Sequence, residues 1–206
     1  MNIRAEQYNM KVRDSGMPEE SYWETFFNPQ YIFSKLKLDN KINNAAEFGS
    51  GYGTFTIPAA KIIKGTLHAF DIEPEMISIL KGKVDKEKIS NIKIHKIDFV
   101  KEGTKLKDES VDYVILFNIL HAEDPIALLQ EAYRVLQREG KVGVIHWIYS
   151  KSTPRGPSLD IRPKPEQCID WMKSAGFKIE SGIISLPPYH YGIIGIRKQL
   201  HKKIYK

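Results

Sequence analysis

The sequence has little cysteine and no long apolar run. Its one cysteine, Cys168, has no partner within the chain, so neither an internal disulfide nor a zinc site built from cysteines is expected. The longest apolar stretches, 111–120 and 182–196, are too short to span a membrane or are interrupted by proline. The first 16 residues combine charged side chains with no apolar run, unlike a secretory signal peptide. We therefore expect a soluble, cytoplasmic protein with no membrane partner and no metal.

No segment is repetitive or strongly polar, and the composition is that of a globular protein. The 206 residues are 42% hydrophobic and 27% charged, which fits a single domain with one sizeable core. The 31 lysines and arginines exceed the 25 acids, for a net charge of +6. This excess is compatible with attraction to nucleic acid or to an anionic substrate. Several of the cations crowd the last ten residues, where a solvated tail is the favoured interpretation.

From residue 41 onward, short apolar runs alternate with longer amphipathic segments. This alternation is typical of a parallel sheet covered by helices. It predicts an α/β fold with strands near 44–48, 66–71, 92–97, 112–117 and 141–148, and with helices near 54–63, 74–84 and 125–137. A loop rich in proline and glycine, a helix over 165–175 and two antiparallel strands, 177–185 and 191–198, are expected to complete the fold.

Three regions are expected within one domain, residues 1–206. Residues 1–40 are predicted to be helical, with one helix starting near Pro18 and ending at Asn28-Pro29. We interpret this region as a lid over the site, with simple apolar packing as the alternative. Residues 41–150 are expected to form a cofactor-binding core, and residues 151–206 to supply a loop, a helix and a final strand pair on the substrate side.

Glycines cluster between the first predicted strand and the first predicted helix. Gly49, Gly51 and Gly53 alternate in Glu47-Phe-Gly-Ser-Gly-Tyr-Gly-Thr, and glycine lets the backbone turn tightly and approach a ligand closely. A dinucleotide fingerprint would need glycine or alanine at position 54, but Thr54 stands there. The preceding Glu47 repels phosphate and attracts a cation such as an amino acid ammonium. The loop therefore predicts a nucleotide-like cofactor that carries positive charge.

Two acids end the next two predicted strands. Asp71 lies 22 residues beyond Gly49 (71 − 49 = 22), close to the spacing of about 20 expected for an acid that binds ribose hydroxyls, with Glu73 as the alternative. Asp98 is placed to accept a hydrogen bond from an adenine amine. Each residue also has a plain structural interpretation, with Asp71 and Asp98 as helix caps and the glycines as packing positions. Their common place at successive strand ends favours a cofactor site.

This combination resembles the class I S-adenosylmethionine-dependent methyltransferases. The resemblance covers roughly residues 45–198 and rests on four ordered motifs: the glycine loop, Asp71, Asp98-Phe99 and the segment 111–121. It implies a three-layer Rossmann-like methyltransferase fold, with a seven-stranded, mostly parallel sheet in the order 3-2-1-4-5-7-6 and strand 7 antiparallel. It also implies S-adenosylmethionine as cofactor and S-adenosylhomocysteine as product.

The resemblance assigns cofactor contacts by position. The glycine loop would hold the methionine part, Asp71 the ribose and Asp98 the adenine amine, with Ile72 and Phe99 around the ring. The implied cofactor-binding residues are Glu47, Gly49, Ser50, Gly51, Gly53, Asp71, Ile72, Asp98, Phe99 and Asn118.

Candidate groups for the chemistry follow the fourth and fifth predicted strands. Methyl transfer needs alignment and exclusion of water, and it needs a base only when the nucleophile arrives protonated. His121 is the candidate base, since an unperturbed imidazole titrates near neutral pH. The alternative is a loop histidine bonded to Asp124 or to the backbone. His146, Trp147 and Arg155 are the candidate substrate contacts, and Arg162 is a further candidate for binding an anion.

The sequence favours a small-molecule acceptor. Amino-directed nucleic-acid methyltransferases are similar but carry an N/D-P-P-Y/F motif, whereas this chain has Asn118-Ile-Leu-His. The similar arsenite methyltransferases need several cysteines. RNA or protein methylation is the alternative suggested by the charge, and a non-catalytic S-adenosylmethionine-binding protein is another, because no residue of the sequence is an obligatory catalyst.

Overall fold

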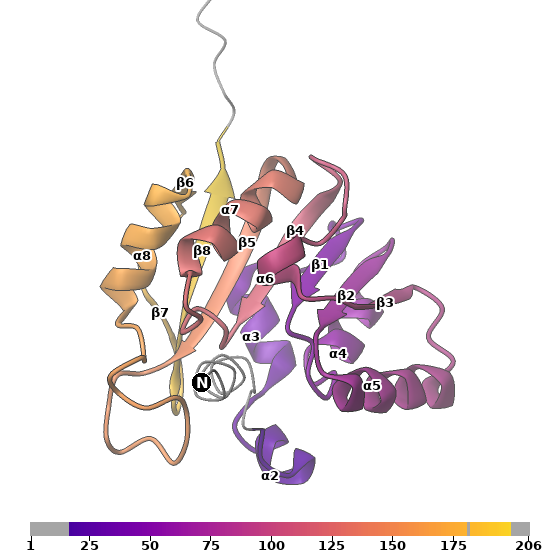
Figure 1. The fold of residues 1–206 in the computed structure, drawn as a ribbon, viewed down its shortest axis with the longest axis horizontal. Helices are drawn as coiled ribbons and strands as arrows, with labels where there is room; N and C mark the ends of the chain where they lie inside the picture. The colour runs from indigo at the N-terminus through magenta and orange to yellow at the C-terminus, as the bar shows by residue number, and fades with distance from the viewer. Residues whose placement is uncertain (1–16, 181, 199–206) are drawn as a thin grey trace, which may run out of the picture.

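The computed structural model describes residues 17–180 and 182–198, which form one mixed α/β sheet flanked by helices (Figure 1). The helices are α2 (Glu20–Glu24), α3 (Pro29–Leu36), α4 (Thr56–Ile62), α5 (Pro74–Glu87), α6 (Phe99–Glu102), α7 (Pro125–Val135) and α8 (Pro165–Ser174). The strands are β1 (Ala45–Phe48), β2 (Leu67–Asp71), β3 (Ile92–Lys96), β4 (Val111–Phe117), β5 (Leu136–Trp147), β6 (Phe177–Ile179), β7 (Ile184–Leu186) and β8 (His190–Arg197). None of the described helices is long and apolar enough to cross a membrane.

The strand order confirms the predicted fold. The sheet runs β3-β2-β1-β4-β5-β8-β6, with β1 to β5 parallel and β8 antiparallel to β5. The expected strand 177–185 is instead two short strands, β6 and β7, which both pair with β8. Between them, the Glu180 carboxylate forms ion pairs with Lys37 and Lys141, and Gly182 weakens strand propensity. The sheet therefore has eight strands rather than seven.

Alternate residues of each strand point to opposite layers, as the two-residue period of a strand requires. Ala46 and Phe48 of β1 pack with α7 and α8, whereas Ala45 packs with α3 and α4. The same alternation runs along β4 from Tyr113 to Phe117. Glu47 occupies the α3/α4 side of β1 and is only 2% exposed. The pattern thus buries a carboxyl group inside an otherwise apolar layer.

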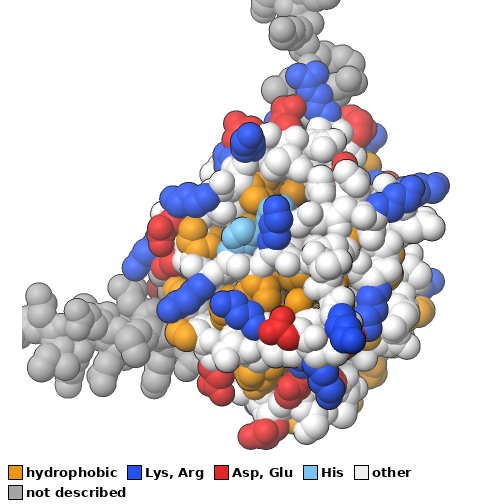
Figure 2. All heavy atoms as spheres, turned by 90° about the vertical axis from the view of Figure 1, so that its right-hand side faces the viewer, with side chains coloured by type: hydrophobic (Ala, Val, Ile, Leu, Met, Phe, Trp, Pro, Cys, Tyr) orange, Lys and Arg blue, Asp and Glu red, His pale blue; other side chains and the backbone are white. Residues whose placement is uncertain are grey.

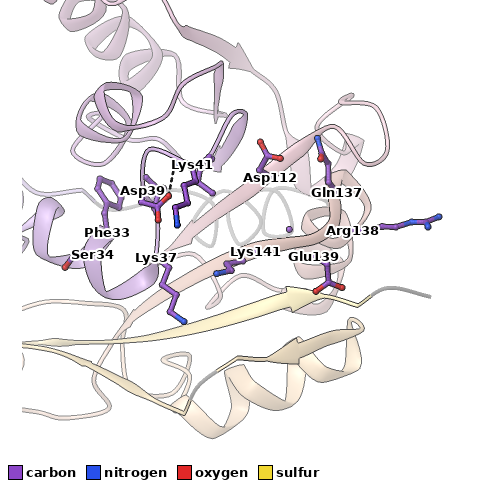
Figure 3. A pocket seen from close by; sticks show the side chains of 13 residues that line it. Phe33, Ser34, Lys37, Asp39, Lys41, Asp112, Gln137, Arg138, Glu139 and Lys141 are labelled. Carbon is purple, nitrogen blue, oxygen red and sulfur yellow. Dashed lines mark hydrogen bonds between the residues drawn. The ribbon is translucent and has the colours of Figure 1, made fainter. Parts of the chain in front are cut away.

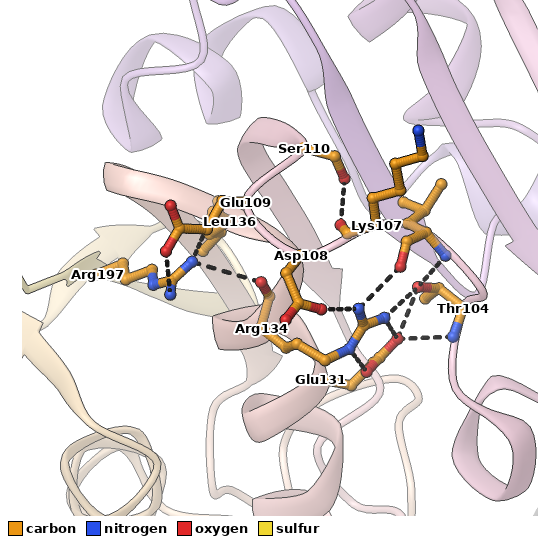
Figure 4. A network of polar contacts seen from close by, with 10 residues as sticks. Thr104, Lys107, Asp108, Glu109, Ser110, Glu131, Arg134, Leu136 and Arg197 are labelled. Atoms are coloured by element: carbon orange, nitrogen blue, oxygen red, sulfur yellow. Dashed lines mark hydrogen bonds and ion pairs between the residues drawn. The ribbon is translucent and has the colours of Figure 1, made fainter.

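A polar network joins α7 to the start of β5 (Figure 4). The Arg134 guanidinium donates to the carboxylates of Glu131 (2.7 Å) and Asp108 (2.6 Å), and the Arg197 guanidinium donates to the Leu136 carbonyl and to Glu109. This network lies where the expected helix 125–137 stops at Val135, so that β5 begins at Leu136, earlier than predicted.

The described part of the N-terminal region contains two short helices. Asn28 and Pro29 separate them as expected, but they also start the second one: the Asn28 side chain accepts from the Tyr31 amide (3.0 Å) and Pro29 occupies the first turn. Residues 1–16 of the predicted lid lie outside the described residues.

Candidate functional site

A cavity of about 450 Å³ lies at the carboxyl ends of the parallel strands, where open α/β sheets place their ligands. The loops after β1, β2, β3, β4 and β5 all contribute to its wall. The predicted residues that line it are Gly49, Ser50, Gly51, Asp71, Ile72, Asp98, Phe99, Asn118, His121, Trp147 and Arg155. Three predicted residues, Glu47, Gly53 and His146, do not line it.

The glycine loop turns across the end of β1 in a left-handed conformation. Gly49 has φ +80° and Gly51 has φ +50°, a region that side chains with a Cβ rarely adopt. The amides of Gly49 and Ser50 donate to the Phe70 carbonyl of β2, at 2.9 Å each. The loop backbone therefore forms part of the cavity floor and is fixed to the neighbouring strand.

Asp71 ends β2 and ties two loops together. Its carboxylate accepts from the Gly51 amide (2.8 Å) and from the Glu73 amide (3.0 Å), and the residue is 7% exposed. Glu73, the alternative ribose acid, also lines the cavity. Asp71 thus presents a buried carboxylate to the cavity beside the glycine loop.

Several buried polar atoms of the wall have no hydrogen-bond partner among the described residues. They are Ser50 Oγ, Thr54 Oγ1, and Oδ1 and Nδ2 of Asn118. Buried polar groups are nearly always satisfied, so this set fits a polar ligand that approaches the glycine loop. The sequence analysis did not identify Thr54 as a site residue, although its departure from the dinucleotide fingerprint was the available signal.

Glu47 and Gly53 have structural roles behind the wall. Burial raises the pKa of Glu47 to about 8; the hydrogen bond that Thr56 Oγ1 donates to its carboxyl (2.5 Å) opposes this rise, and the charge of Asp71 adds to it. Glu47 is therefore mostly neutral at pH 7. A Cβ at Gly53 would lie 2.6 Å from Leu80 Cδ1 of α5, so glycine there permits close packing of the loop on that helix.

Asp98 and Phe99 serve both the wall and the start of α6. Asp98 is the N-cap of α6, since its Oδ1 accepts from the Lys101 amide (3.2 Å). The Phe99 ring packs on Phe48, with 5.3 Å between centroids. The capping role considered from the sequence is thus present, and both residues line the cavity as well.

The end of the cavity near β5 is apolar and aromatic. Trp147 ends β5 and is 2% exposed, and its ring centroid lies 6.4 Å from that of Trp23 and 5.3 Å from that of Phe26. Trp23, Phe55, Phe117 and Trp147 all line the cavity. The described part of the N-terminal region therefore contributes to the wall.

Arg162 holds the loop that follows β5. Its buried guanidinium donates to the carbonyls of Pro157 (2.6 Å) and Ile148 (3.1 Å) and to Thr153 Oγ1 (2.6 Å). These carbonyl and hydroxyl acceptors occupy the side chain that the sequence offered as an anion-binding group. Arg162 is instead a structural anchor, and the loop it holds brings Arg155, Gly156 and Pro157 to the cavity.

His121 lines the cavity and contacts His146 behind it. His146 Nε2 lies 3.4 Å from His121 Nδ1, and His146 Nδ1 accepts from the Trp147 amide (3.0 Å). Burial lowers the pKa of His121 to about 4 and holds that of His146 well below its usual value. Both imidazoles are therefore neutral at physiological pH.

A second cavity of about 470 Å³ lies at the opposite, amino-terminal edge of the sheet (Figure 3). Charged side chains line it, among them Lys37, Asp112 and Lys141. Ligands of open α/β sheets bind at the other edge, and the predicted motifs all lie there. We therefore place the functional site in the carboxyl-end cavity. Among the described residues, no group of three or more His, Cys, Asp or Glu side chains is arranged to hold a metal ion.

Part of the chain is similar to known methyltransferases. Residues 45–140 match a family model described as a methyltransferase domain. This segment belongs to the class I S-adenosylmethionine-dependent methyltransferase family. The cofactor of that family is S-adenosylmethionine, and the unpartnered polar atoms, the left-handed glycines and the buried Asp71 suit its amino acid and ribose groups.

Solved structures share the fold. A SAM-dependent methyltransferase from Aquifex aeolicus has a TM-score of 0.76 at 22% identity, with 91% of this chain and 97% of that chain covered. The [4+2]-cyclase SpnF has a TM-score of 0.71 at 13% identity, with 82% and 79% covered. Because a protein called a cyclase shares the architecture, these similarities show the fold and not the reaction.

A curated relative is similar over part of its length. A protein described as probable ribosomal RNA small subunit methyltransferase A, from Methanosphaera stadtmanae, is 33% identical over 104 residues. The match covers 47% of this chain and 34% of the relative. The chain thus spans about a third of the curated relative it matches.

Proposed function

We propose that this chain transfers the methyl group of S-adenosylmethionine to a small-molecule acceptor. The observation that carries the proposal is the cavity itself. Its wall combines unpartnered polar atoms of Ser50, Thr54 and Asn118 with aromatic rings and with the loop after β5. Polar groups that can hold a cofactor and apolar walls that can enclose a small acceptor are what a donor and a small acceptor need.

The residues on the cofactor side would bind and orient the cofactor. The Asp71 carboxylate would accept hydrogen bonds from ribose hydroxyls, and the Ser50 and Asn118 side chains would pair with polar groups of the amino acid part. When bound, S-adenosylmethionine supplies a methyl group on a positively charged sulfur. Glu47 is neutral and lies behind the wall, so Asp71 and Asp98 are the predicted site carboxylates that line the cavity.

The acceptor side excludes water. Trp23, Trp147 and Ile161 give it an apolar wall, and Arg155 adds a cationic side chain. Displacement at a methyl carbon depends chiefly on alignment and on a dry environment, and aromatic walls supply both for a flat or aliphatic molecule. A small acceptor with an apolar body and an anionic or polar group fits these walls.

The face of the molecule in Figure 2 gives no support to a polymeric acceptor. On the face shown in Figure 2, lysine and arginine side chains are scattered among acidic ones and do not form one continuous basic patch. Nucleic-acid-binding surfaces gather their cations along the path of the backbone phosphates. This face therefore lacks the electrostatic pattern that RNA binding requires.

Label transfer tests the proposal. The protein is incubated with methyl-labelled S-adenosylmethionine and a cell extract, which is then separated into small-molecule, RNA and protein fractions. We expect label in the small-molecule fraction. Label in the RNA or protein fraction would contradict the choice of acceptor, and binding of S-adenosylhomocysteine without label in any fraction would favour a non-catalytic binding protein.

RNA methylation is the second candidate. It is favoured by the description of the Methanosphaera stadtmanae relative as a ribosomal RNA methyltransferase and by the net charge of +6. Binding of RNA that weakens steeply with rising salt concentration would support it. Absence of RNA binding at low salt would exclude it.

A further inference from the structure

We propose that His146 is a positioning residue that fixes the imidazole of His121 as a hydrogen-bond donor toward the cavity, so that His121 binds the acceptor and does not deprotonate it. The part that concerns the acceptor rests on the function proposed above. The part that concerns the two imidazoles rests on their geometry alone.

The backbone determines which nitrogen of His146 carries the proton. Trp147 lies two residues beyond Ile145, the last residue of β5 that pairs with β4. Its amide donates to His146 Nδ1 at 3.0 Å. A nitrogen that accepts a hydrogen bond from an amide is unprotonated, so a neutral His146 has its proton on Nε2.

The environment of His146 keeps it neutral. Its side chain is fully buried, and burial is the main cause of its low pKa. The neighbouring groups that face it, His121, His190 and Arg162, lower the pKa further, while the Trp147 hydrogen bond opposes this. No carboxylate is among these electrostatic neighbours. A second proton on His146 would thus be a buried, uncompensated charge.

The proton on His146 then determines the tautomer of His121. His146 Nε2 faces His121 Nδ1 at 3.4 Å, and a donor on one side requires a lone pair on the other. His121, whose pKa is lowered to about 4 by burial, is neutral as well. Its single proton is therefore on Nε2, the ring nitrogen that His146 does not engage, and His121 lines the cavity.

These tautomers change the role expected for His121. A general base needs a free lone pair facing the substrate, but the lone pair of His121 faces His146. The group offered to the cavity is an N–H. The acceptor that fits carries a hydrogen-bond-accepting oxygen, such as a carboxylate or carbonyl, and attacks through an atom whose lone pair is already free at neutral pH.

Nuclear magnetic resonance of the full chain labelled with 15N-histidine tests the geometric part. We expect His121 and His146 to remain neutral between pH 5 and 8, each with the proton on Nε2. The His146→Gln variant retains a donor and should leave the His121 tautomer unchanged, whereas His146→Leu should let both tautomers of His121 appear. A proton on Nδ1 of His121, or its titration in this range, would overturn the proposal even if the leucine variant fails to fold.

A matched control comes from the other histidine pair. His68 Nδ1 and His95 Nε2 lie 3.0 Å apart on β2 and β3, away from the cavity lining. His95→Gln removes one partner of that pair and should leave the His121 signals unchanged. A change in His121 equal to that in His146→Leu would show that the effect is not local and would contradict the proposal.

Activity of two His121 variants tests the part that concerns the acceptor. Glutamine keeps an N–H donor but cannot accept a proton, and proton transfer by a positioned base is worth about 10²–10⁴-fold. We expect His121→Gln to retain label transfer within about tenfold of wild type and His121→Leu to lose more. An equal, hundredfold or greater loss in both would identify His121 as a base. Absence of label transfer in the wild type would instead refute the proposed function. The tautomers of His121 and His146 would still be tested by the nuclear magnetic resonance experiment.

Discussion

The two ends of the sheet hold cavities of nearly equal volume but opposite chemistry. The carboxyl-end cavity, about 450 Å³, is lined by polar atoms of Ser50, Thr54 and Asn118 that have no partner among the described residues. The amino-end cavity, about 470 Å³, is lined by charged groups, among them Lys37 and Lys141, which both pair with Glu180. Size does not distinguish the functional cavity; unsatisfied hydrogen-bonding capacity does.

The largest expected effect comes from comparing one valine substitution at each cavity. Gly51→Val places a branched side chain at φ +50° and in the space next to the loop, so we expect binding of S-adenosylhomocysteine to weaken by more than about 100-fold. Gln137→Val, at the amino-end cavity, adds a residue that suits a strand and should leave the affinity unchanged. Isothermal titration calorimetry compares them, with thermal melting as the control for folding. Equal affinities in the two variants would contradict the placement of the site.

An acid near each cavity, Glu47 or Glu180, gives the next comparison. The pKa of Glu47 is raised to about 8 by burial, so its protonated form is favoured in the folded chain. Since the unfolded side chain titrates near its ordinary pKa, stability is lost as the pH rises from about 4.5 toward 8. Glu47→Gln has no such loss and should be more stable than wild type by roughly 3 kcal/mol at pH 8, with little difference at pH 4.

Glu180 has the opposite dependence. Burial raises its pKa, but the hydrogen bonds and charges of Lys37 and Lys141 outweigh burial and lower it. Its stabilising effect is therefore present above the ordinary pKa and is lost at lower pH. Glu180→Gln should destabilise the chain at pH 8, by about 1 kcal/mol because these ion pairs are partly exposed. Urea unfolding at pH 4 and pH 8 measures the free energy of unfolding of both variants. A change in the same direction for both variants at pH 8 would disprove the contrast.

Two aspartates that accept backbone hydrogen bonds sharpen the comparison. Asp71 accepts from the amides of Gly51 and Glu73, and Asp112 accepts from those of Asn43 and Asn44. Asp71→Asn and Asp112→Asn each remove the charge and should lower the free energy of unfolding by about 1–2 kcal/mol. Only Asp71→Asn should also weaken S-adenosylhomocysteine binding, by about 10-fold. Weaker binding in Asp112→Asn by the same factor would show that the effect acts through stability alone.

The smallest expected effect concerns two serines. Ser50→Ala removes an unpartnered hydroxyl of the carboxyl-end cavity and should reduce cofactor affinity by about two- to tenfold. Ser34→Ala, at the amino-end cavity, removes a hydroxyl that donates to the Tyr31 carbonyl and should not alter affinity. Calorimetry at one temperature resolves the difference. Unchanged affinity in Ser50→Ala would remove this hydroxyl from the site.

The sequence predicted the parts of the site that depend on local pattern. The glycine loop and Asp71 follow apolar runs that form β1 and β2, and parallel strands bring those ends to one edge. The exclusion of Glu47 and His146 from the lining required three-dimensional information, because the layer that covers a strand decides which side chains face the cavity. Arg162 was misinterpreted because its acceptors are loop carbonyls, which no sequence pattern reveals.

A crystal structure of the chain with S-adenosylhomocysteine is the most direct test of the central claim. We predict that the ligand occupies the carboxyl-end cavity, with its ribose at Asp71 and its amino acid part against Ser50, Gly51 and Asn118. A ligand bound in the amino-end cavity instead, or a carboxyl-end cavity closed by its own side chains at saturating ligand, would contradict the claim.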